Sequence, residues 1–446
     1  MSVREYLDAA KTKGNGRPVR ARGRVLAVPA ESRWSRIWRP FWTLPAAICL
    51  VAVVAGLVLP PLEERISAHI PFVFQGGPDG ARSVLGTIAS AMISVTGLIF
   101  SITMVVLQLA SSQFTPRVLG TFLSSRITQL TLGVFTATFV FSLSVLRYVK
   151  GANENGGNFV PQTSVTLAFA LVLASVACFV AFIHFITTSI QVAHVISRIG
   201  DNTVDALDAV YPAAPDDDDT PRHGPTWSPV EGAPRVPVLV RDRHGSVTHI
   251  DAQALVDVAA RLDAVITVDV QAGQFATSGQ QVARVWGRTQ VEEADLKRIR
   301  RLIWLGGERQ LRQDVGFGLR QLVDIAERAL SPGINDPTTA VQVIDEIHRI
   351  LRELVVRETP SPYVADPDGR VRVVHQPQAI DGLIELGVRE IAHYGSDSPR
   401  VLARLTEMLT DLRGCALNRY GSTLDGLLGE ISKAGSAAAG QEKDRP

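Results

Sequence analysis

The sequence predicts an α-helical membrane protein with about four transmembrane helices, followed by a cytoplasmic α+β domain in which a small β-rich unit precedes helices. Charged residues are rare between Phe41 and Gln191 and become dense after Arg198. Four apolar runs lie in the charge-poor half, and each has the roughly 20 residues that a helix needs to cross the hydrocarbon core. The second half alternates short strand-like and helix-like patterns, as a folded soluble domain does.

The four apolar runs are expected to be the transmembrane helices. They span Phe41–Leu59, Val84–Ala110, Ile127–Leu146 and Thr163–Ile190. The first run is expected to end at Pro60 and Pro61. We expect it to be retained, because the stretch Leu59-Pro60-Pro61-Leu62 offers no small-residue cleavage site. The second and fourth runs are long enough to tilt or to extend past the bilayer surface.

Basic residues around the first run predict the orientation. Ten of them precede it: Arg4, Lys11, Lys13, Arg17, Arg20, Arg22, Arg24, Arg33, Arg36 and Arg39. The segment that follows it has Arg65 and Arg82, and short segments rich in Lys and Arg stay on the cytoplasmic side. This predicts a multi-pass protein of the cell (inner) membrane with both termini cytoplasmic. Residues 1–40 are expected to be disordered and, being basic, to lie against anionic lipid.

Small and polar residues form one face of the second apolar run, which we call the small-polar face. Its members are Thr87, Ser90, Ser94, Gly97, Ser101, Met104, Gln108 and Ser111. Their alternating spacing of three and four places them on one side of a helix. One interpretation is helix packing, because small residues let two backbones approach. The other is a pore wall in a ring of subunits, which Gln108 favours because an amide facing lipid is costly.

The soluble half is expected to have four parts. A Pro- and Asp-rich linker covers residues 201–236, a small β-rich unit 237–290, a helical domain 291–432 and a disordered tail 433–446. The expected helices are Glu292–Arg301, Glu308–Ala329, Thr338–Arg357, Ala379–His393 and Pro399–Ala416. The Gly273-x-Phe275 and Gly279-x-x-Val282 spacing resembles lipoyl and biotinyl carrier domains. No lysine lies between Val236 and Leu296, so the carrier chemistry is absent.

A corner between two expected helices carries the second candidate site. The stretch Ser331-Pro332-Gly333 ends the first helix, and Asp336 with Pro337 is a typical helix start. Asn335 and Asp336 are therefore either a structural corner or a pair of oxygen donors for a cation or polar ligand. On the first helix, a spacing of four allows Arg320 to pair with Asp324, and Asp324 with Arg328.

The chain resembles a known family in three stretches. They are Asp314–Ala326 (DVGFGLRQLVDIA), Ala329–Ala340 (ALSPGINDPTTA) and Ser94–Pro116. Together they resemble the uncharacterised bacterial membrane-protein family called domain of unknown function 2254, over nearly the whole chain beyond the basic N-terminus. The resemblance implies a membrane protein and implies no reaction.

Several function classes are disfavoured by the sequence. A net charge of +1 argues against nucleic acid as a main partner. The three cysteines, Cys49, Cys178 and Cys415, lie far apart and away from ligand-spaced histidines, which disfavours a disulfide framework or a zinc site. No phosphate-binding loop, zinc-protease or nucleophile-elbow motif is present, so we expect no enzyme, cofactor or metal.

Two functions remain open. The first is an oligomeric ion channel or conductance pathway with a cytoplasmic gating domain, in which a ring of subunits supplies the pore that four helices alone lack. The second is a non-conducting membrane sensor or scaffold whose cytoplasmic domain binds a partner. The expected partners are the lipid bilayer and further copies of the chain, and the sequence specifies neither an ion nor a small ligand.

Overall fold

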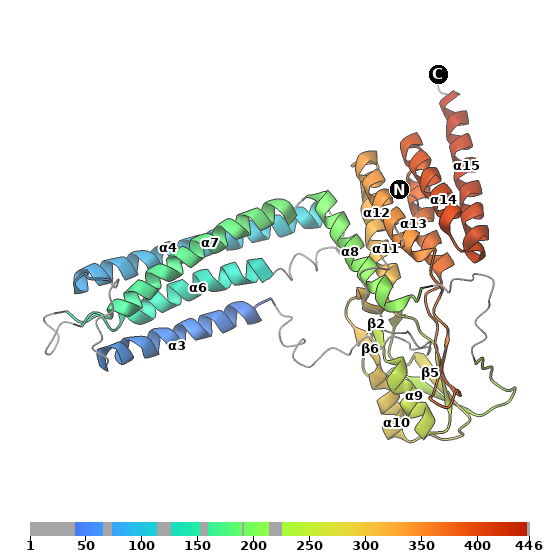
Figure 1. Ribbon diagram of the computed structural model, residues 1–446, viewed down its shortest axis with the longest axis horizontal. Helices are drawn as coiled ribbons and strands as arrows, with labels where there is room; N and C mark the ends of the chain where they lie inside the picture. Colours follow the sequence, from blue (N-terminus) through green and yellow to red (C-terminus); the bar gives the residue numbers. More distant parts are fainter. Residues whose placement is uncertain are drawn as a thin grey trace, which may run out of the picture.

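A rod of four long helices is joined to a globular domain at one of its ends (Figure 1). This computed structural model describes residues 41–65, 74–113, 126–151, 159–189, 191–213 and 225–443. The basic segment 1–40, expected to be disordered, lies outside the described residues.

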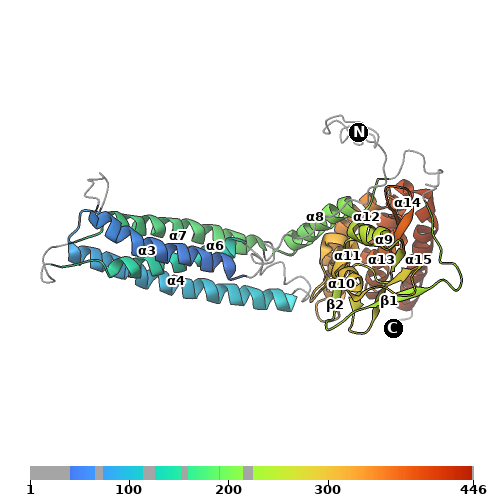
Figure 2. The ribbon, with the colours of Figure 1, turned by 90° about the horizontal axis from the view of Figure 1, so that it is seen from below.

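All four helices of the rod are long and apolar enough to cross a membrane. They are α3 (Thr43–Arg65), α4 (Pro78–Gln113), α6 (Arg126–Leu146) and α7 (Gln162–Ser189). The start of α3 and the end of α7 lie at the same end of the rod, toward the globular domain (Figures 1 and 2). This arrangement agrees with an even number of crossings.

Helix α3 does not end at Pro60 and Pro61, as the sequence predicted, but continues through both to Arg65. A proline lacks the N–H that would bond the carbonyl four residues earlier, which for Pro61 is that of Leu57. The Tyr148 hydroxyl donates a hydrogen bond to this Leu57 carbonyl at 3.3 Å. A side chain from another part of the bundle therefore replaces the missing bond.

Helix α6 is the centre of the bundle. Of its membrane span 56% is buried, against 11–17% for the other three spans. It packs on α3, α4 and α7 through Phe135, Phe141 and Val145. At Gly133 a Cβ atom would come within 2.9 Å of Ile48 and 3.1 Å of the Pro45 backbone, so α3 and α6 approach closely there.

Charged residues hold the bundle together at the end away from the globular domain. The Glu63 carboxylate accepts hydrogen bonds from the Thr163 N–H at 2.5 Å and the Ser164 N–H at 3.3 Å. It therefore caps the N-terminus of α7. At the same end, Arg82 donates to the Val149 carbonyl at 3.0 Å.

The helical part of the globular domain includes the helix that leaves the membrane. Its members are α8 (Val192–Val210), α11 (Val315–Leu330), α12 (Pro337–Leu354), α13 (Ile380–Tyr394), α14 (Pro399–Cys415) and α15 (Gly421–Lys443). Leu207 of α8 and the adjacent Tyr211 share one buried core with Leu319 and Ile347. The range 201–236, expected to be a linker, thus begins inside a packed helix. The range 433–446, expected to be a disordered tail, is helical to Lys443.

The β-rich unit draws on more of the chain than residues 237–290. Its strands are β1 (Arg235–Leu239), β2 (Gly245–Ile250), β3 (Val265–Val268), β4 (Phe275–Ala276), β5 (Gln281–Trp286), β6 (Ile303–Gly306), β7 (Tyr363–Ala365) and β8 (Val371–Val374). One sheet has the order β1-β5-β3-β8-β7 and the other β4-β2-β6. The hairpin β7–β8 joins the first sheet because β8 pairs with β3 in parallel, with Val373 opposite Ile266.

Two helices complete the β-rich unit: α9 (Ala252–Arg261) and α10 (Glu293–Leu302). Their presence between the strands distinguishes the unit from the all-β carrier domains that its glycine spacing resembles. Asp251 caps α9 by accepting a hydrogen bond from the Ala254 N–H at 3.0 Å.

Candidate functional site

Helix α4 has two different faces. Seven residues of the small-polar face are exposed: Thr87, Ser90, Ser94, Gly97, Ser101, Met104 and Gln108. The side chain of the eighth, Ser111, lies outside the described part of the chain. The opposite face, with Leu85, Ile88 and Met92, is buried in the bundle. At about 100° per residue, the two sets point in nearly opposite directions. Within the described residues, the small-polar face therefore points away from the other three helices of the bundle.

Hydroxyl groups on this face bond within their own helix. The Thr87 hydroxyl donates to the Ser83 carbonyl at 2.8 Å, and the Ser94 hydroxyl to the Ser90 carbonyl at 2.9 Å. Such bonds satisfy the donor while leaving the oxygen able to accept another. The face is thus compatible with water and with a second helix.

A groove runs beside the small-polar face, between α3, α4 and α6. Its volume is about 570 Å³, and its lining includes Trp42, Cys49, Ile93, Gly97 and Phe100. A Cβ atom at Gly97 would meet nothing within 4 Å. The space around Gly97 is therefore open in the single chain, whereas Gly133 is tightly packed.

The interior of the bundle contains a second set of polar residues, which the sequence analysis missed. Buried on α6 are Thr128, Gln129, Thr131, Thr138 and Ser142. The hydroxyls of Thr138 and Ser175 lie 3.1 Å apart in a hydrogen bond between α6 and α7. One feature of the sequence could have indicated these buried polar residues: the mean hydropathy of the third apolar run is the lowest of the four.

The corner at Asn335 and Asp336 forms the start of α12. One Asp336 carboxylate oxygen accepts the N–H groups of Thr338 and Thr339 at 3.0 and 3.1 Å, and the other accepts the Thr339 hydroxyl at 2.6 Å. These bonds hold the pKa of Asp336 below its usual value. Asn335 has a φ of 48°, a left-handed conformation that Asn tolerates. Both Asp336 oxygens thus have partners within the corner.

A buried carboxylate joins the β-rich unit to the helical part. Asp314 is 1% exposed and is bonded by Arg309 through two contacts, at 2.8 and 2.9 Å. The Gln378 amide donates to the same carboxylate at 2.7 Å, and the Tyr211 hydroxyl donates to the Gln378 carbonyl at 2.9 Å. The segment that follows α8 is thereby connected to both parts of the globular domain.

One arginine on α11 is shared by three carboxylates. The predicted pair exists, with Arg320 at 3.9 Å from Asp324, and Arg320 also lies 3.7 Å from Glu327. Its shortest contacts are to Glu390 of α13, a partner that sequence spacing did not predict. Burial and the nearby Glu390 raise the pKa of Glu327 to about 7. The cluster therefore contains a carboxyl group that titrates near neutral pH.

The described ranges contain no group of three or more His, Cys, Asp or Glu side chains that could hold a metal ion. Cys49, Cys178 and Cys415 are free thiols. Burial raises the pKa of the Cys415 thiol, which disfavours a reactive thiolate.

Comparison with known proteins identifies the family. The model of a family described as "Predicted membrane protein (DUF2254)" matches residues 38–411. The chain belongs to this family. The DUF2254 match covers the four membrane helices, the small-polar face and the corner at Asp336, and it ends before α15.

Two relatives are uncharacterized proteins of mycobacteria, Mb1321c from Mycobacterium bovis and Rv1290c from Mycobacterium tuberculosis. Each is 33% identical over 376 residues, which cover 83% of this chain and 71% of the relative. No solved structure matches the chain. Membership in DUF2254 thus describes this chain as a predicted membrane protein of unknown function.

Proposed function

We propose that this DUF2254 protein is an oligomeric ion channel or conductance pathway of the cell (inner) membrane, with no catalytic activity of its own. Both termini are cytoplasmic in this proposal, and the globular domain gates the pathway. The observation that carries it is the outward direction of the small-polar face, opposite the side of α4 that packs in the bundle.

A ring of subunits gives this face a role. Ser94, Ser101 and Gln108 would line a shared axis, where hydroxyl and amide oxygens replace part of the hydration shell of an ion. Met104 is the one large apolar member, and it would form a constriction where loss of water closes the path. Exposure to lipid instead would leave the Gln108 amide in a costly environment.

The connection between the two halves supports a gating role for the globular domain. Helix α7 ends at Ser189 and α8 begins at Val192, so the membrane and the domain are joined by a very short connection. Leu207 near the end of α8 is completely buried in the core of the helical part. A rearrangement of that core therefore acts directly on the end of a membrane helix.

The second candidate is a non-conducting sensor or scaffold. The internal hydroxyl bonds of Thr87 and Ser94 and the open groove at Gly97 favour it, because a helix of a second copy can pack closely on such a surface. In that case the small-polar face forms a contact between copies and encloses no water.

Cysteine accessibility separates the two candidates. Single cysteines at Ser94, Ser101 and Gln108, in a variant that lacks the native cysteines, should react with a water-soluble thiol reagent in proteoliposomes. A cysteine at Leu173, which is 59% exposed on α7, reports lipid exposure and should stay unreactive. Reactive positions together with a measurable conductance support the channel. Unreactive positions without conductance support the sensor or scaffold, and a monomer in mild detergent contradicts the oligomeric channel.

A further inference from the structure

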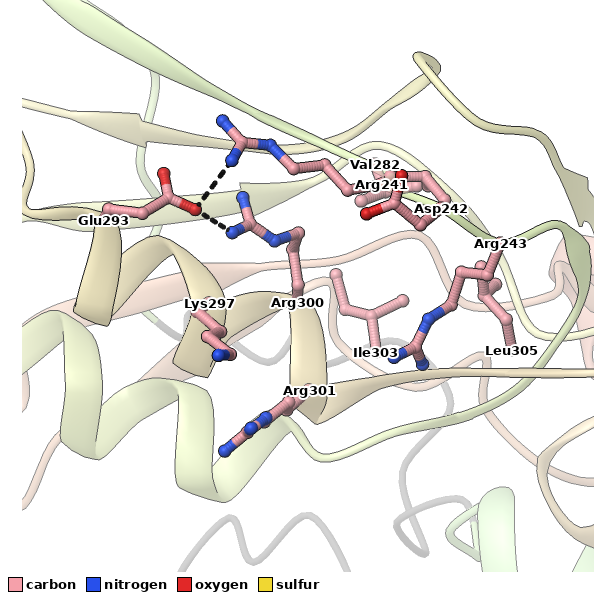
Figure 3. A pocket seen from close by; sticks show the side chains of 11 residues that line it. Arg241, Asp242, Arg243, Val282, Glu293, Lys297, Arg300, Arg301, Ile303 and Leu305 are labelled. Atoms are coloured by element: carbon pink, nitrogen blue, oxygen red, sulfur yellow. Dashed lines mark hydrogen bonds and ion pairs between the residues drawn. The ribbon is translucent and has the colours of Figure 1, made fainter.

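A pocket in the β-rich unit carries an unbalanced positive charge. Its rim has five cationic side chains, Arg241, Arg243, Lys297, Arg300 and Arg301, and two carboxylates, Asp242 and Glu293 (Figure 3). The cavity volume is about 360 Å³. The whole chain has a net charge of only +1, so an excess of three positive charges around one cavity is a local feature.

The sequence brings these charges together from two segments. Helix α10 (EADLKRIRRL) presents Glu293, Lys297, Arg300 and Arg301 on one face, at helical spacings of three and four. The turn between β1 and β2 supplies the other charged residues. Its Asp242 has a φ of 55°, which reverses the chain sharply.

The floor of the pocket is apolar. It is formed by Val240, Val282, Ile303 and Leu305, which lie on strands or directly after one. The first three are at most 5% exposed. Arg243 lies near Ile303 and Leu305 at one end of the cavity (Figure 3). The pocket therefore combines a cationic rim with an apolar surface large enough for a small organic molecule.

One carboxylate already occupies part of the rim. Glu293 accepts a hydrogen bond from Arg241 at 3.1 Å and another from Arg300 (Figure 3). The Glu293 side chain is 54% exposed, whereas that of Arg300 is 15% exposed. An exposed carboxylate held between two guanidinium groups shows that the rim accepts an oxyanion, and it can be displaced by a stronger one.

The remaining cations of the pocket differ from most arginines of the globular domain. Elsewhere Arg372 pairs with Asp263 and Asp366, and Arg389 with Glu385 and Glu430. Within the described part of the chain, no ion pair within 4.0 Å joins a carboxylate to Arg243, Lys297 or Arg301, and only Lys297 interacts at longer range with Glu293. Like charges gathered with so few carboxylates repel one another, and an anionic ligand removes that repulsion.

We propose that this pocket binds the phosphate group of a small organic phosphate, with Arg241, Arg243 and Arg300 on the phosphate oxygens and the apolar part of the ligand on the valine and isoleucine floor. Planar guanidinium groups match phosphate oxygens through paired hydrogen bonds. A phosphate monoester carries about 1.5–2 negative charges at pH 7, more than the Glu293 carboxylate that it displaces. The proposal does not depend on conductance.

Calorimetric titration of the full chain in a neutral detergent tests the proposal. The probes are inorganic phosphate, adenosine monophosphate as a phosphate on a larger organic body whose purine ring can lie on the floor, and adenosine as its phosphate-free control. Adenosine monophosphate should bind more tightly than inorganic phosphate, and adenosine should not bind. Dihexanoyl phosphatidylglycerol, compared with dihexanoyl phosphatidylcholine, identifies the lipid source: binding of the glycerol lipid alone assigns the phosphate to an anionic headgroup.

Four variants locate the binding. Arg300→Gln and Arg243→Gln should each weaken binding about tenfold or more, because each removes a charged hydrogen-bond donor. Arg298→Gln, on the same helix and outside the pocket lining, should change it less than about twofold. Glu293→Gln should tighten binding severalfold, a gain that a misfolded protein cannot produce.

The proposal is overturned if none of the phosphate probes binds to the wild-type protein at millimolar concentration and low salt. It is also overturned if Arg298→Gln weakens binding as much as Arg243→Gln. A Glu293→Gln variant that binds no more tightly than the wild type contradicts the displacement of Glu293.

Discussion

Helices α4 and α6 both place Ser and Thr side chains in an apolar membrane helix, but they direct them oppositely. On α6, Thr138 is completely buried, and its hydroxyl contacts both the Val134 carbonyl of its own helix and the Ser175 hydroxyl of the neighbouring helix. On α4, Ser94 is exposed and bonds a carbonyl of its own helix. A polar residue in a membrane helix therefore does not reveal which side of the helix packs. The packing partner decides that, and it lies elsewhere in the sequence.

The largest expected effect compares two glycines, one on each helix. Gly133→Leu should destabilise the bundle by about 1–3 kcal/mol or more, because the side chain would overlap Ile48 and the Pro45 backbone. Gly97→Leu should leave the thermal stability of the single subunit unchanged, because its Cβ meets nothing within 4 Å. Melting temperature in detergent, followed together with oligomeric state, measures both.

A loss of stability in the Gly97→Leu monomer would show that the two helices do not differ as described. A change in the oligomer alone would support packing or ring formation through the small-polar face. Ala91→Leu is a suitable control, since Ala91 is also exposed on α4 but points about 120° away from Gly97 around the helix.

In the globular domain, the same comparison asks whether Asp336 has its partners within the chain or binds an external ligand. Asp336→Ala should lower the free energy of unfolding by about 0.5–2 kcal/mol at pH 7, because it removes a helix cap with three hydrogen bonds. The folded state lowers the pKa of Asp336, so this stabilisation is present above the unfolded pKa near 3.9 and is lost as pH falls through the folded pKa.

Denaturant unfolding of the two proteins at pH 7 and pH 3 measures this difference. Asp257→Ala is the control, because Asp257 is exposed on α9. If Asp336→Ala leaves stability unchanged but abolishes a shift in melting temperature on adding a cation, the corner binds a ligand instead.

The Arg320 cluster is expected to respond to pH in the opposite sense. The pKa of Glu327 is raised to about 7, so the folded state holds this proton more tightly than the unfolded chain, whose pKa is about 4.3. The stabilisation is complete below the unfolded value and is lost as pH rises through about 7. Glu327→Gln should therefore match the wild type near pH 4 and be more stable at pH 8, by less than the roughly 3.5 kcal/mol of the full pKa shift because solvent screens this partly exposed carboxyl.

Thermal unfolding across that pH range tests the cluster, whose charged members facing Glu327 are Arg320, Asp324 and Glu390. A constant difference between variant and wild type at every pH would show that Glu327 does not titrate there. A less stable variant at pH 8 would mean that the Glu327 charge favours folding through Arg320.

The smallest expected effect returns to the two membrane helices. Thr138→Val should destabilise the bundle by about 0.6 kcal/mol, the average for a hydrogen bond between membrane helices. Thr87→Val should have no measurable effect on the monomer, because the Thr87 hydroxyl bonds its own helix and lies on an exposed face. Reversible unfolding in mixed micelles has the precision to separate these values if both variants are measured in parallel.

Features that depend on neighbouring residues were predicted well from the sequence. The four membrane helices follow from length and hydropathy, and the cap at Asp336 follows from the Asp-Pro pair that begins α12.

Features that depend on distant residues were not predicted. The continuation of α3 past Pro61 requires Tyr148, and the main partner of Arg320 is Glu390, which is 70 residues away. The helix α8 was missed although Val195, Ile199 and Leu207 recur at helical spacing. The helix α15 was missed because its sequence is only weakly amphipathic, and its apolar face becomes meaningful only against the core that it covers. The burial of Thr138 on α6 likewise depends on three other helices.

The junction between α7 and α8 has a mechanical consequence. Helix α8 has 19 residues, which gives a length of about 28 Å at 1.5 Å per residue. A rotation of about 10° at its membrane end moves its far end by about 5 Å, close to the pitch of one helical turn. Membrane helices change tilt when the bilayer becomes thicker or thinner. If α8 follows a tilt of α7, the length of α8 converts a small angle into a displacement of several ångströms near Leu207. A packed core accommodates such a displacement only by rearranging.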